Sequence, residues 1–487
     1  MHDRVTLGRR TLLVVLQYII GTVVGLICIT LPAKYFDVGV FGLVIGVGFS
    51  AFHILAFFSD LGLKQTHMGF VHRYGFAECN SSYALAKVIL GSFSSIAFLL
   101  IVFLTGSSKV MLIFLLCALL FTLRDLPIGI FDSRIETMKS QSSLIVEHIM
   151  RLVFTIVLTL LAIGEPEDVQ AIYLSLTFLL SMLASTAFAL LLLRGYPFAK
   201  PLYVKEYFSA APAIAFMGGI DIIMLNADKL ILQFFVSTEA LGVYTGVNKI
   251  AQLVFYLSTA LITILLPAVA AMDDSRAAKA TSFAERYLML AIFPIAFFSI
   301  VLRNDIIRYL LPQEAFLEGG FSMVLLMLAT LLLASSRSEA VLLFARSRNR
   351  EATLINSLLA VFYIASTALL SELRGIDGAA LAALLSGLFS FLAFRYACTK
   401  LGKEFIGKRF LKQLLAVIIA SAALFLLGFF DPGEAVFLFF LFRIAAGIII
   451  YGFVLILLRE LKLEDLAYAL ELIGEHDEGK HSNNGKK

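Results

Sequence analysis

Residues 209–272 read SAAPAIAFMGGIDIIMLNADKLILQFFVSTEALGVYTGVNKIAQLVFYLSTALITILLPAVAAM. This stretch consists of two long apolar segments on either side of a short turn, Ser237-Thr238-Glu239-Ala240-Leu241. Each segment is long enough to cross the hydrocarbon core of a bilayer as a helix, which needs about 20 residues. The sequence therefore predicts a transmembrane helical hairpin, around which the rest of the chain can be interpreted.

Polar residues lie inside both apolar segments, where they are unfavourable. A charge at the bilayer centre costs about 2.5–3.5 kcal/mol on the insertion scale, so these side chains must face protein or water. They are Asp221, Asn226, Asp228 and Lys229 on the first segment and Asn248, Lys249 and Gln252 on the second. Asp228 and Lys249 lie about equally far from the turn, so we expect them at similar depth. Two interpretations stay open: a cation or substrate site in a central cavity, or a structural ion pair of Asp228 with Lys249.

The composition places the whole chain in the membrane. Its 487 residues are 60% hydrophobic and 15% charged, whereas soluble domains average about 45–50% and 25%. The formal net charge of +4 is too small to indicate a nucleic-acid partner. Apolar windows predict an all-α polytopic membrane protein with about fourteen transmembrane helices. The predicted spans are 11–31, 40–58, 82–105, 110–130, 143–163, 169–193, 209–235, 242–268, 285–302, 319–344, 353–371, 377–397, 411–430 and 435–458.

Lysine and arginine are distributed unevenly between the two sides of the membrane. The loops on the side of the N-terminus hold most of them, including Arg134, Lys139 and Arg346, whereas the other side has acidic stretches such as Glu165-Pro166-Glu167-Asp168. Short cytoplasmic loops carry an excess of Lys and Arg. We therefore expect a multi-pass protein of the plasma membrane with both termini in the cytoplasm. The polar tail at residues 460–487 is expected to be partly disordered.

A weak internal repeat links the two halves of the chain. Val40-Phe41-Gly42-Leu43 opens the second predicted span, and Ala240-Leu241-Gly242-Val243 opens the eighth. The offset of about 200 residues corresponds to six spans, and an even number of spans preserves orientation, so the repeats would be parallel.

A second group of charged residues lies in the cytoplasmic halves of four other predicted spans. These residues are Lys87, Arg124, Arg151 and Arg337. Arginine offers paired donors that fit phosphate oxygens, so one interpretation is a pocket for an anionic head group, open to the cytoplasm. The alternative is that these side chains reach the lipid head groups or pair with Asp125, Glu147 and Glu339.

The histidines and the search for nucleotide-binding motifs give little support for a proton relay, a metal site or ATP-driven transport. His53 lies in the middle of the second predicted span, where a hydrogen-bonded packing role competes with a proton relay. We expect no metal site, because the remaining histidines lack further ligands at metal-binding spacing. No phosphate-binding loop of the Gly-x4-Gly-Lys-Ser/Thr type occurs, so ATP-driven transport by this chain alone is not expected. We expect no cofactor.

Several short motifs occur in the order found in one transporter family. They are Ser59-Asp60-Leu61-Gly62-Leu63, Asp228-Lys229-Leu230-Ile231, Leu241-Gly242-Val243-Tyr244, Asn248-Lys249-Ile250 and Gly375-Ile376-Asp377-Gly378-Ala379. On these motifs the chain resembles, over nearly its whole length, the polysaccharide-exporter branch of the multidrug/oligosaccharidyl-lipid/polysaccharide exporter superfamily. That branch includes O-antigen-type flippases of lipid-linked oligosaccharides.

The resemblance implies an architecture. It implies two pseudo-symmetric six-helix lobes, residues 1–200 and 201–405, around a central cavity, plus an extra helix pair at residues 406–459. Helices one, two, seven and eight would line the cavity. The first helix has only Gln17 and Tyr18 as polar features and no internal arginine, which differs from the peptidoglycan-precursor flippases.

The function implied is a secondary transporter that flips an isoprenoid-linked oligosaccharide from the cytoplasmic to the outer leaflet by alternating access. Its partners would be the lipid-linked oligosaccharide, membrane lipids, and a polymerase or glycosyltransferase of the same pathway. A cation-coupled multidrug exporter of the same superfamily is the first alternative. An integral-membrane glycosyltransferase or ligase is the second, although the short predicted external loops argue against it. Ion coupling through Asp221 or Asp228 stays open.

The predicted orientation can be tested by labelling single cysteines from either side of the membrane. A cysteine at Glu167 should react only from outside and a cysteine at Lys403 only from the cytoplasm, because the Lys and Arg asymmetry sets the topology. Labelling of both positions from the same side would contradict the predicted topology.

Overall fold

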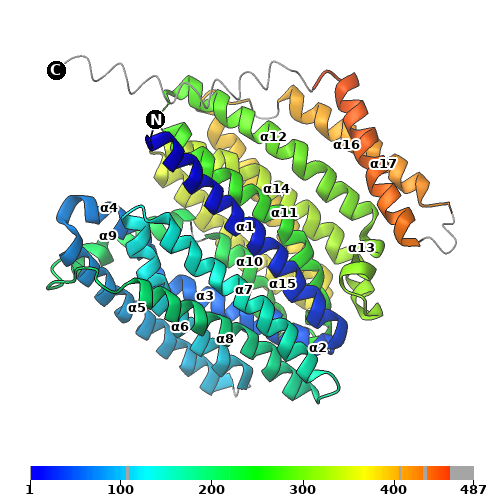
Figure 1. Ribbon diagram of the computed structural model, residues 1–487. Helices are drawn as coiled ribbons and strands as arrows, with labels where there is room; N and C mark the ends of the chain where they lie inside the picture. The colour runs from blue at the N-terminus through cyan, green and yellow to red at the C-terminus, as the bar shows by residue number, and fades with distance from the viewer. Residues whose placement is uncertain are drawn as a thin grey trace. The chain divides into compact units, whose positions relative to one another are not determined.

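The computed structural model describes residues 2–105, 109–218, 220–270, 272–404, 407–430 and 436–460, with the side chains of parts of α1, α5 and α9–α12 left out. No strand occurs in these ranges. The α-helices (Figure 1) are α1 His2–Tyr35, α2 Val38–Phe41, α3 Phe49–Asp60, α4 Leu63–Tyr74, α5 Phe76–Thr105, α6 Lys109–Ser133, α7 Thr137–Ala162, α8 Glu167–Leu192, α9 Val204–Gly218, α10 Ile220–Leu232, α11 Thr238–Ala270, α12 Asp274–Val301, α13 Arg303–Leu310, α14 Gly320–Ala345, α15 Asn349–Thr399, α16 Lys408–Leu427 and α17 Val436–Leu457. A π-helix, η1 Gly42–Gly48, follows α2, and a 3₁₀-helix, η2 Glu314–Gly319, precedes α14.

The fold class predicted from the sequence is confirmed as an all-helical membrane architecture. Ten helical segments of the described chain are long and apolar enough to cross a membrane. The count of fourteen spans stays a prediction. The tail beyond residue 460 lies outside the described residues.

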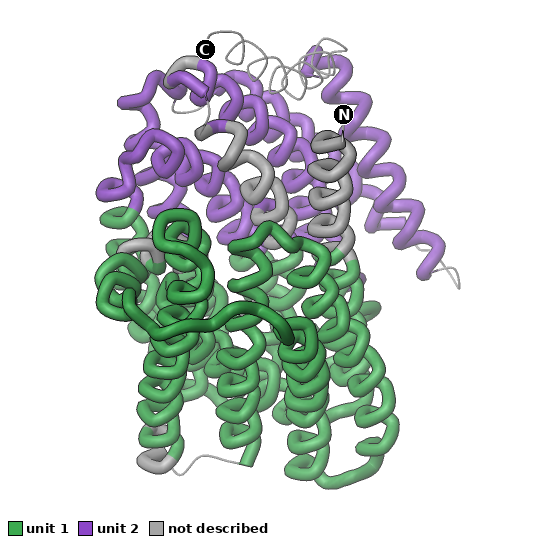
Figure 2. Tube along the Cα trace, turned by 60° about the vertical axis from the view of Figure 1, so that its left-hand side comes forward, with its two compact units in different colours: residues 1–253, 306–326, 353–386 green, residues 254–305, 327–352, 387–487 purple. Residues whose placement is uncertain are grey.

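The chain divides into two compact units, coloured separately in Figure 2. Unit 1 comprises residues 1–253, 306–326 and 353–386, and unit 2 comprises residues 254–305, 327–352 and 387–487. In unit 1, α7 packs against α8 and α1, and α6 packs against α8. In unit 2, α16 and α17 pack against each other and against α12. The lobe boundaries expected from the resemblance stay a prediction.

The central hairpin forms as expected, but its turn is shorter. The second arm is α11, which begins at Thr238 rather than after Leu241. The reason is local, because the Ser237 hydroxyl accepts a hydrogen bond from the Ala240 amide at 3.2 Å and so caps the free end of the helix. The first arm comprises α9 and α10.

The predicted break between the eleventh and twelfth spans is a kink inside α15. Arg374 and Gly375 leave helical backbone angles, and Gly375 has φ +55°. That left-handed conformation favours glycine because it has no Cβ.

The two repeat motifs meet within unit 1. A Cβ on Gly42 would lie 2.6 Å from the amide nitrogen of Gly242, and a Cβ on Gly242 would clash with the Val38 carbonyl. Only glycine on both sides permits this backbone approach, as in small-residue helix contacts of membrane proteins. Corresponding residues of two repeats can meet only near the axis that relates them, so this contact marks where such an axis would lie; the repeat itself stays a prediction.

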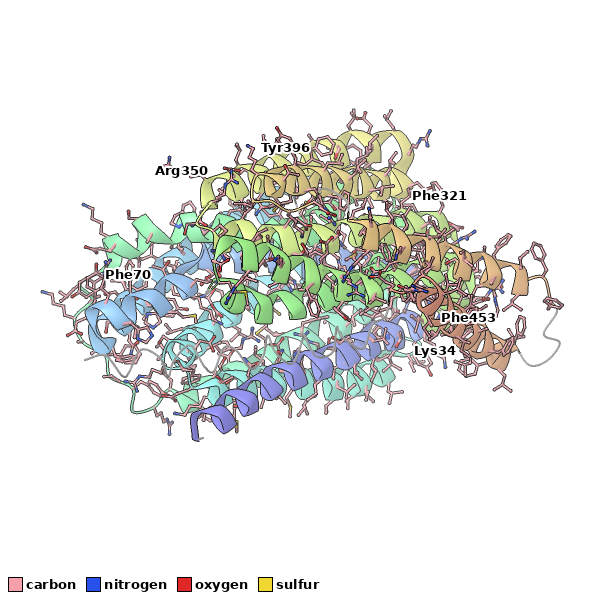
Figure 3. All side chains as sticks on the ribbon, turned by 90° about the horizontal axis from the view of Figure 1, so that it is seen from above. Lys34, Phe70, Phe321, Arg350, Tyr396 and Phe453 are labelled. Carbon is pink, nitrogen blue, oxygen red and sulfur yellow. The ribbon has the colours of Figure 1, made fainter. Side chains whose placement is uncertain are left out.

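The apolar outer faces suit a lipid environment. Phe321, Tyr396 and Phe453 project outward (Figure 3) and are 57%, 65% and 63% exposed. Large apolar groups are common on such a surface when lipid chains rather than water cover it.

The structure also changes the choice of topology reporter. Lys403 is buried in ion pairs with Glu285 and Glu339, so a cysteine at this position would be both inaccessible and destabilising. The nearby Lys400 is exposed and is the better cytoplasmic reporter.

We expect Gly42→Ala to lower the melting temperature of the purified protein, because the added methyl meets backbone rather than a flexible side chain. Overpacking of this kind costs about 1–3 kcal/mol. Gly452→Ala in α17 is the matched control, since no atom lies within 4 Å of the added Cβ. Equal melting temperatures for the two variants would show that the Gly42–Gly242 contact is not tight.

Candidate functional site

Asp228 lies at the centre of a buried polar group on α10 and α11, which we call the hairpin cluster. Its members are Asp228, Lys229, Tyr244, Asn248, Lys249 and Gln252. The Asp228 carboxylate accepts hydrogen bonds from Lys229 Nζ at 2.8 Å, Tyr244 Oη at 2.7 Å and Asn248 Nδ2 at 3.2 Å. Asp228 and Lys229 are 1% and 0% exposed, so the carboxylate is neutralised by a cation built into the chain.

An ion pair of Asp228 with Lys249 was one of the two interpretations left open. The direct ion-pair partner of Asp228 is Lys229, the next residue along α10, and Lys249 is within electrostatic range of the same carboxylate. Lys249 Nζ donates to Gln252 Oε1 at 3.2 Å and lies 4.9 Å from the Phe49 ring centroid. In the described chain no carboxylate lies within ion-pair distance of Lys249. The cluster has one carboxylate and two ammonium groups, which leaves one surplus positive charge.

The other candidates of the central region are placed separately. Asp221 lies half-buried in the first turn of α10. Asn226 donates to the Ile222 carbonyl of its own helix at 2.8 Å. His53 Nδ1 lies 2.8 Å from the Phe49 carbonyl oxygen, between the rings of Phe49 and Phe52. These contacts favour the packing role for His53.

Arg124 and Arg151 come together on facing helices, and we call them the arginine pair. Arg124 of α6 and Arg151 of α7 both contact Glu147 of α7, each through a different carboxylate oxygen. Arg124 lies about 14 Å along α6 from its end at Ser133, and Arg151 about 21 Å along α7 from its start at Thr137. A buried guanidinium group, that of Arg124, and a partly buried one, that of Arg151, thus share one carboxylate well inside the helical layer.

The arginine pair also lies near the hairpin cluster. The ammonium of Lys249 is within electrostatic range of Arg151 and of Lys229. The positive charges of α7 and α11 therefore act on the same region of unit 1.

Lys87 belongs to a different group and is fully paired. Its Nζ contacts Asp60 at 2.9 Å and also Asp125. Lys64 contacts Asp132 at 2.8 Å and Asp125 at 3.9 Å. Three aspartates thus surround two lysines, which leaves a surplus of one negative charge. The pairing interpretation therefore holds for Lys87, and this residue does not extend the arginine pair.

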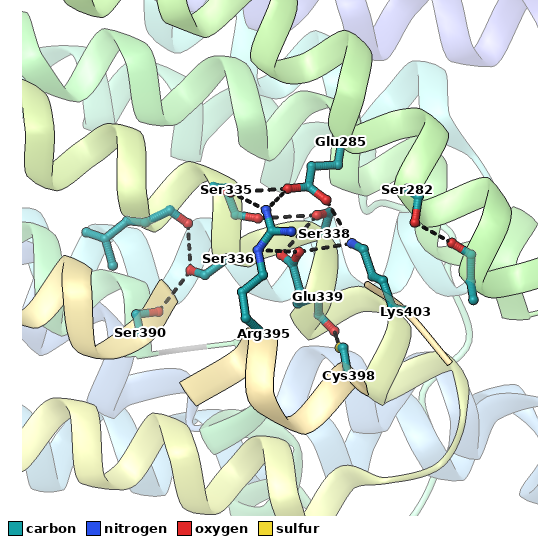
Figure 4. Close-up of polar contacts among 12 residues, drawn as sticks. Ser282, Glu285, Ser335, Ser336, Ser338, Glu339, Ser390, Arg395, Cys398 and Lys403 are labelled. Atoms are coloured by element: carbon teal, nitrogen blue, oxygen red, sulfur yellow. Dashed lines mark hydrogen bonds and ion pairs between the residues drawn. The ribbon is translucent and has the colours of Figure 1, made fainter. Parts of the chain in front are cut away.

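Arg337 lies in unit 2, over the Phe255 ring at 4.5 Å from the centroid. Glu339, which the alternative interpretation offered as a pairing partner, contacts Arg395 at 3.3 Å and Lys403 at 2.9 Å. Arg395 and Lys403 also contact Glu285, so two cations and two carboxylates form a closed buried group (Figure 4). The structure does not bring all four predicted cations of the anion pocket into one site.

Several of these partners were not found from the sequence. Glu285 and Arg395 stand near the ends of their predicted spans, where a charged residue is readily attributed to the loop. Asp60 ends α3 and Asp132 lies in the last turn of α6, so both were also readily attributed to loops. One signal could have indicated these ion pairs. Charges of opposite sign occur at comparable depth along several predicted helices, and such charges can pair when the helices are neighbours.

No group of three or more His, Cys, Asp or Glu side chains in the described chain is arranged to hold a metal ion. The groups differ in their direct ion pairs. In unit 2, Arg395 and Lys403 contact Glu285 and Glu339. In unit 1, both arginines of the arginine pair contact Glu147 alone, and Asp125 is also within electrostatic range of Arg124.

A family model described as "Polysaccharide biosynthesis protein" matches residues 134–315. Among solved structures, one described as "Lipid II flippase MurJ, inward closed conformation" superposes with a TM-score of 0.73 at 15% sequence identity, covering 93% of this chain and 99% of that chain. An inward-facing multidrug resistance MATE family transporter of the MOP superfamily gives 0.60 at 12% identity, covering 79% and 95%. A mutant of the Vibrio cholerae MATE transporter VcmN gives 0.54 at 11% identity, covering 84% and 100%.

Comparison with curated protein sequences gave no significant match. The structural similarities, at these low identities, establish the fold. Together with the family match they confirm the resemblance that the sequence motifs indicated.

We expect the Asp228–Lys229 pair to be structural. Asp228→Asn alone leaves a buried ammonium without a counter-charge, which costs about 3–5 kcal/mol. Asp228→Asn combined with Lys229→Met removes both charges and should recover most of that stability. Thermal unfolding of the purified variants measures the difference. A double variant that is as stable as the parent but inactive in transport would instead assign the pair to the transport cycle.

Proposed function

We propose that this protein is a secondary transporter that flips an isoprenoid-linked oligosaccharide from the cytoplasmic to the outer leaflet of the plasma membrane, for the synthesis of a surface glycan. The fold and the match to a polysaccharide biosynthesis family support the general class. The observation that carries the choice of substrate is the arginine pair, where the buried guanidinium of Arg124 and the partly buried one of Arg151 share a single direct carboxylate partner.

The arginine pair suits a diphosphate head group. Guanidinium groups bind phosphate oxygens through two parallel hydrogen bonds and stay charged when buried. Lys249 adds a third cation from α11 within electrostatic range of Arg151. We propose that Arg124, Arg151 and Lys249 capture the phosphates while the lipid chain stays in the bilayer. Lys87 and Arg337 are left out of this site.

The membrane potential can drive this movement. Moving a net charge of roughly −2 outward gains about 4–5 kcal/mol at 100 mV, inside negative. Coupling to a soluble cation at Asp228 is the weaker alternative, because Lys229 already occupies the ion-pair position. Coupling through Asp221 stays as the second alternative.

The alternative functions would need a binding or catalytic site of a different charge. A multidrug exporter for organic cations would favour a surplus of carboxylates, and the central groups of unit 1 have the opposite surplus. A glycosyltransferase or ligase would need acidic catalytic side chains at a site outside the membrane. The most acidic group in unit 1, around Lys87, is instead occupied in ion pairs with lysines.

The proposed function also implies where the protein works and with what. Both termini would lie in the cytoplasm, and a polymerase or glycosyltransferase would use the flipped lipid on the outer face. These expectations follow from the positive-inside distribution and from the chemistry of a lipid-linked donor.

We expect Arg151→Gln and Arg124→Gln each to lower the flipping rate of reconstituted protein about tenfold or more, since a charge-assisted contact is worth about 1.5–3 kcal/mol. Arg151→Lys keeps the charge but loses the paired donors, so it should recover only part of the rate. The measurement is transfer of a lipid-linked oligosaccharide between leaflets of proteoliposomes, with an imposed inside-negative potential.

The control is Lys400→Gln, which removes an exposed cation at the end of α15 and should leave the rate unchanged. Parental rates in both arginine variants would contradict the proposed site. If the same variants instead increased export of a cationic dye, the multidrug function would be favoured.

A further inference from the structure

Glu147 lies between the two arginines in a way that leaves part of their hydrogen-bonding capacity unused. Its Oε2 contacts Arg124 and its Oε1 contacts Arg151. The Glu147 side chain is 8% exposed and that of Arg124 is 6% exposed. The Arg151 side chain is 15% exposed. The two arginines thus share one direct carboxylate partner, while Asp125 lies within electrostatic range of Arg124.

The orientation of α7 holds Glu147 in this position. His148, the next residue, faces α1, where its Nε2 lies 3.2 Å from Gln17 Nε2. Residues four apart on a helix share one face, so Glu147 and Arg151 both turn towards α6. The contact between α1 and α7 thus fixes which face of α7 meets Arg124. The side chain of Tyr18, the other polar residue of this part of α1, lies outside the described set.

The arginine pair has more donors than its acceptor can satisfy. Each guanidinium has five N–H donors, and Glu147 supplies two oxygens for both groups. Among the described residues, Arg124 Nε and Arg151 Nε make no hydrogen bond. Buried donors without acceptors are unfavourable, so these two atoms could donate to the oxygens of a bound anion.

We propose that Glu147 is an internal counter-anion that holds the place of one substrate phosphate and is displaced when the diphosphate binds. This inference rests on the proposed function. Without substrate, one carboxylate keeps two repelling guanidinium groups in place. A diphosphate brings more negative charge and more acceptor oxygens, so it competes successfully for both. When the head group leaves, Glu147 returns to the arginines and thereby speeds release.

Competition of this kind has a distinctive consequence. Removing the Glu147 charge should strengthen anion binding, whereas removing a purely structural ion-pair partner should weaken binding by disordering the arginines. The two roles therefore predict opposite changes in affinity.

The experiment measures binding of inorganic pyrophosphate to the purified full-length protein by calorimetry. Glu147→Gln should bind pyrophosphate about tenfold more tightly than the parent, and it should flip lipid-linked oligosaccharide more slowly because release is slower. Glu147→Asp keeps the charge but cannot reach both arginines, so its affinity should lie between the other two. Thermal unfolding identifies folded variants.

The matched control is Glu339→Gln in unit 2. Glu339 is also buried and also contacts two cations, Arg395 and Lys403. Its removal creates the same surplus of positive charge in a group that we do not assign to the substrate. Glu339→Gln should leave pyrophosphate affinity unchanged.

Unchanged or weaker pyrophosphate binding in Glu147→Gln would overturn the inference. Unfolding of both Glu147 variants would also overturn it, because Glu147 would then have a purely structural role. If the parent flips the lipid while Glu147→Gln binds no more tightly, only the inference fails. If the parent does not flip lipid-linked oligosaccharide while the Glu147 effect on pyrophosphate appears, the proposed function fails and the anion site stands.

Discussion

A charged side chain inside a helical membrane bundle must be neutralised within the protein, and the buried groups of this chain depend on that constraint. An unpaired ion in a medium of low dielectric constant is strongly unfavourable. Lys87 accordingly lies between Asp60 and Asp125, and Arg395 lies between Glu285 and Glu339. Each pairing joins side chains from different helices, so the charges fix which helical faces meet. The apolar remainder of each helix is free to face lipid.

The second constraint is close backbone packing where the two repeat motifs meet. Gly42 and Gly242 allow η1 and α11 to approach until backbone touches backbone. The π-helical turn of η1, a rare conformation frequent at functional sites, lies at the same place.

Charge balance then distinguishes structural groups from candidate binding groups. The group around Glu285 and Glu339 is neutral and closed, which suits a purely structural role. The arginine pair and the hairpin cluster each hold two cations around one direct carboxylate partner, and Asp125 is also within electrostatic range of Arg124. Both belong to unit 1, and Lys249 and Arg151 lie within electrostatic range of each other. Under the proposed function, the phosphates of the lipid carrier bind to these cations.

The sequence by itself determined the helical class, the central hairpin and the presence of charges inside the spans, because apolar length and charge are properties of the residues themselves. It also indicated the repeat whose glycines meet. Only the tertiary structure decided which charges pair. Sequence position gives depth along a helix, but pairing depends on how each helix is rotated and which helix lies beside it. For that reason Asp228 was matched with Lys249, at similar depth, although Lys229 is its partner. For the same reason Lys87 was grouped with the arginines, although two aspartates on neighbouring helices neutralise it.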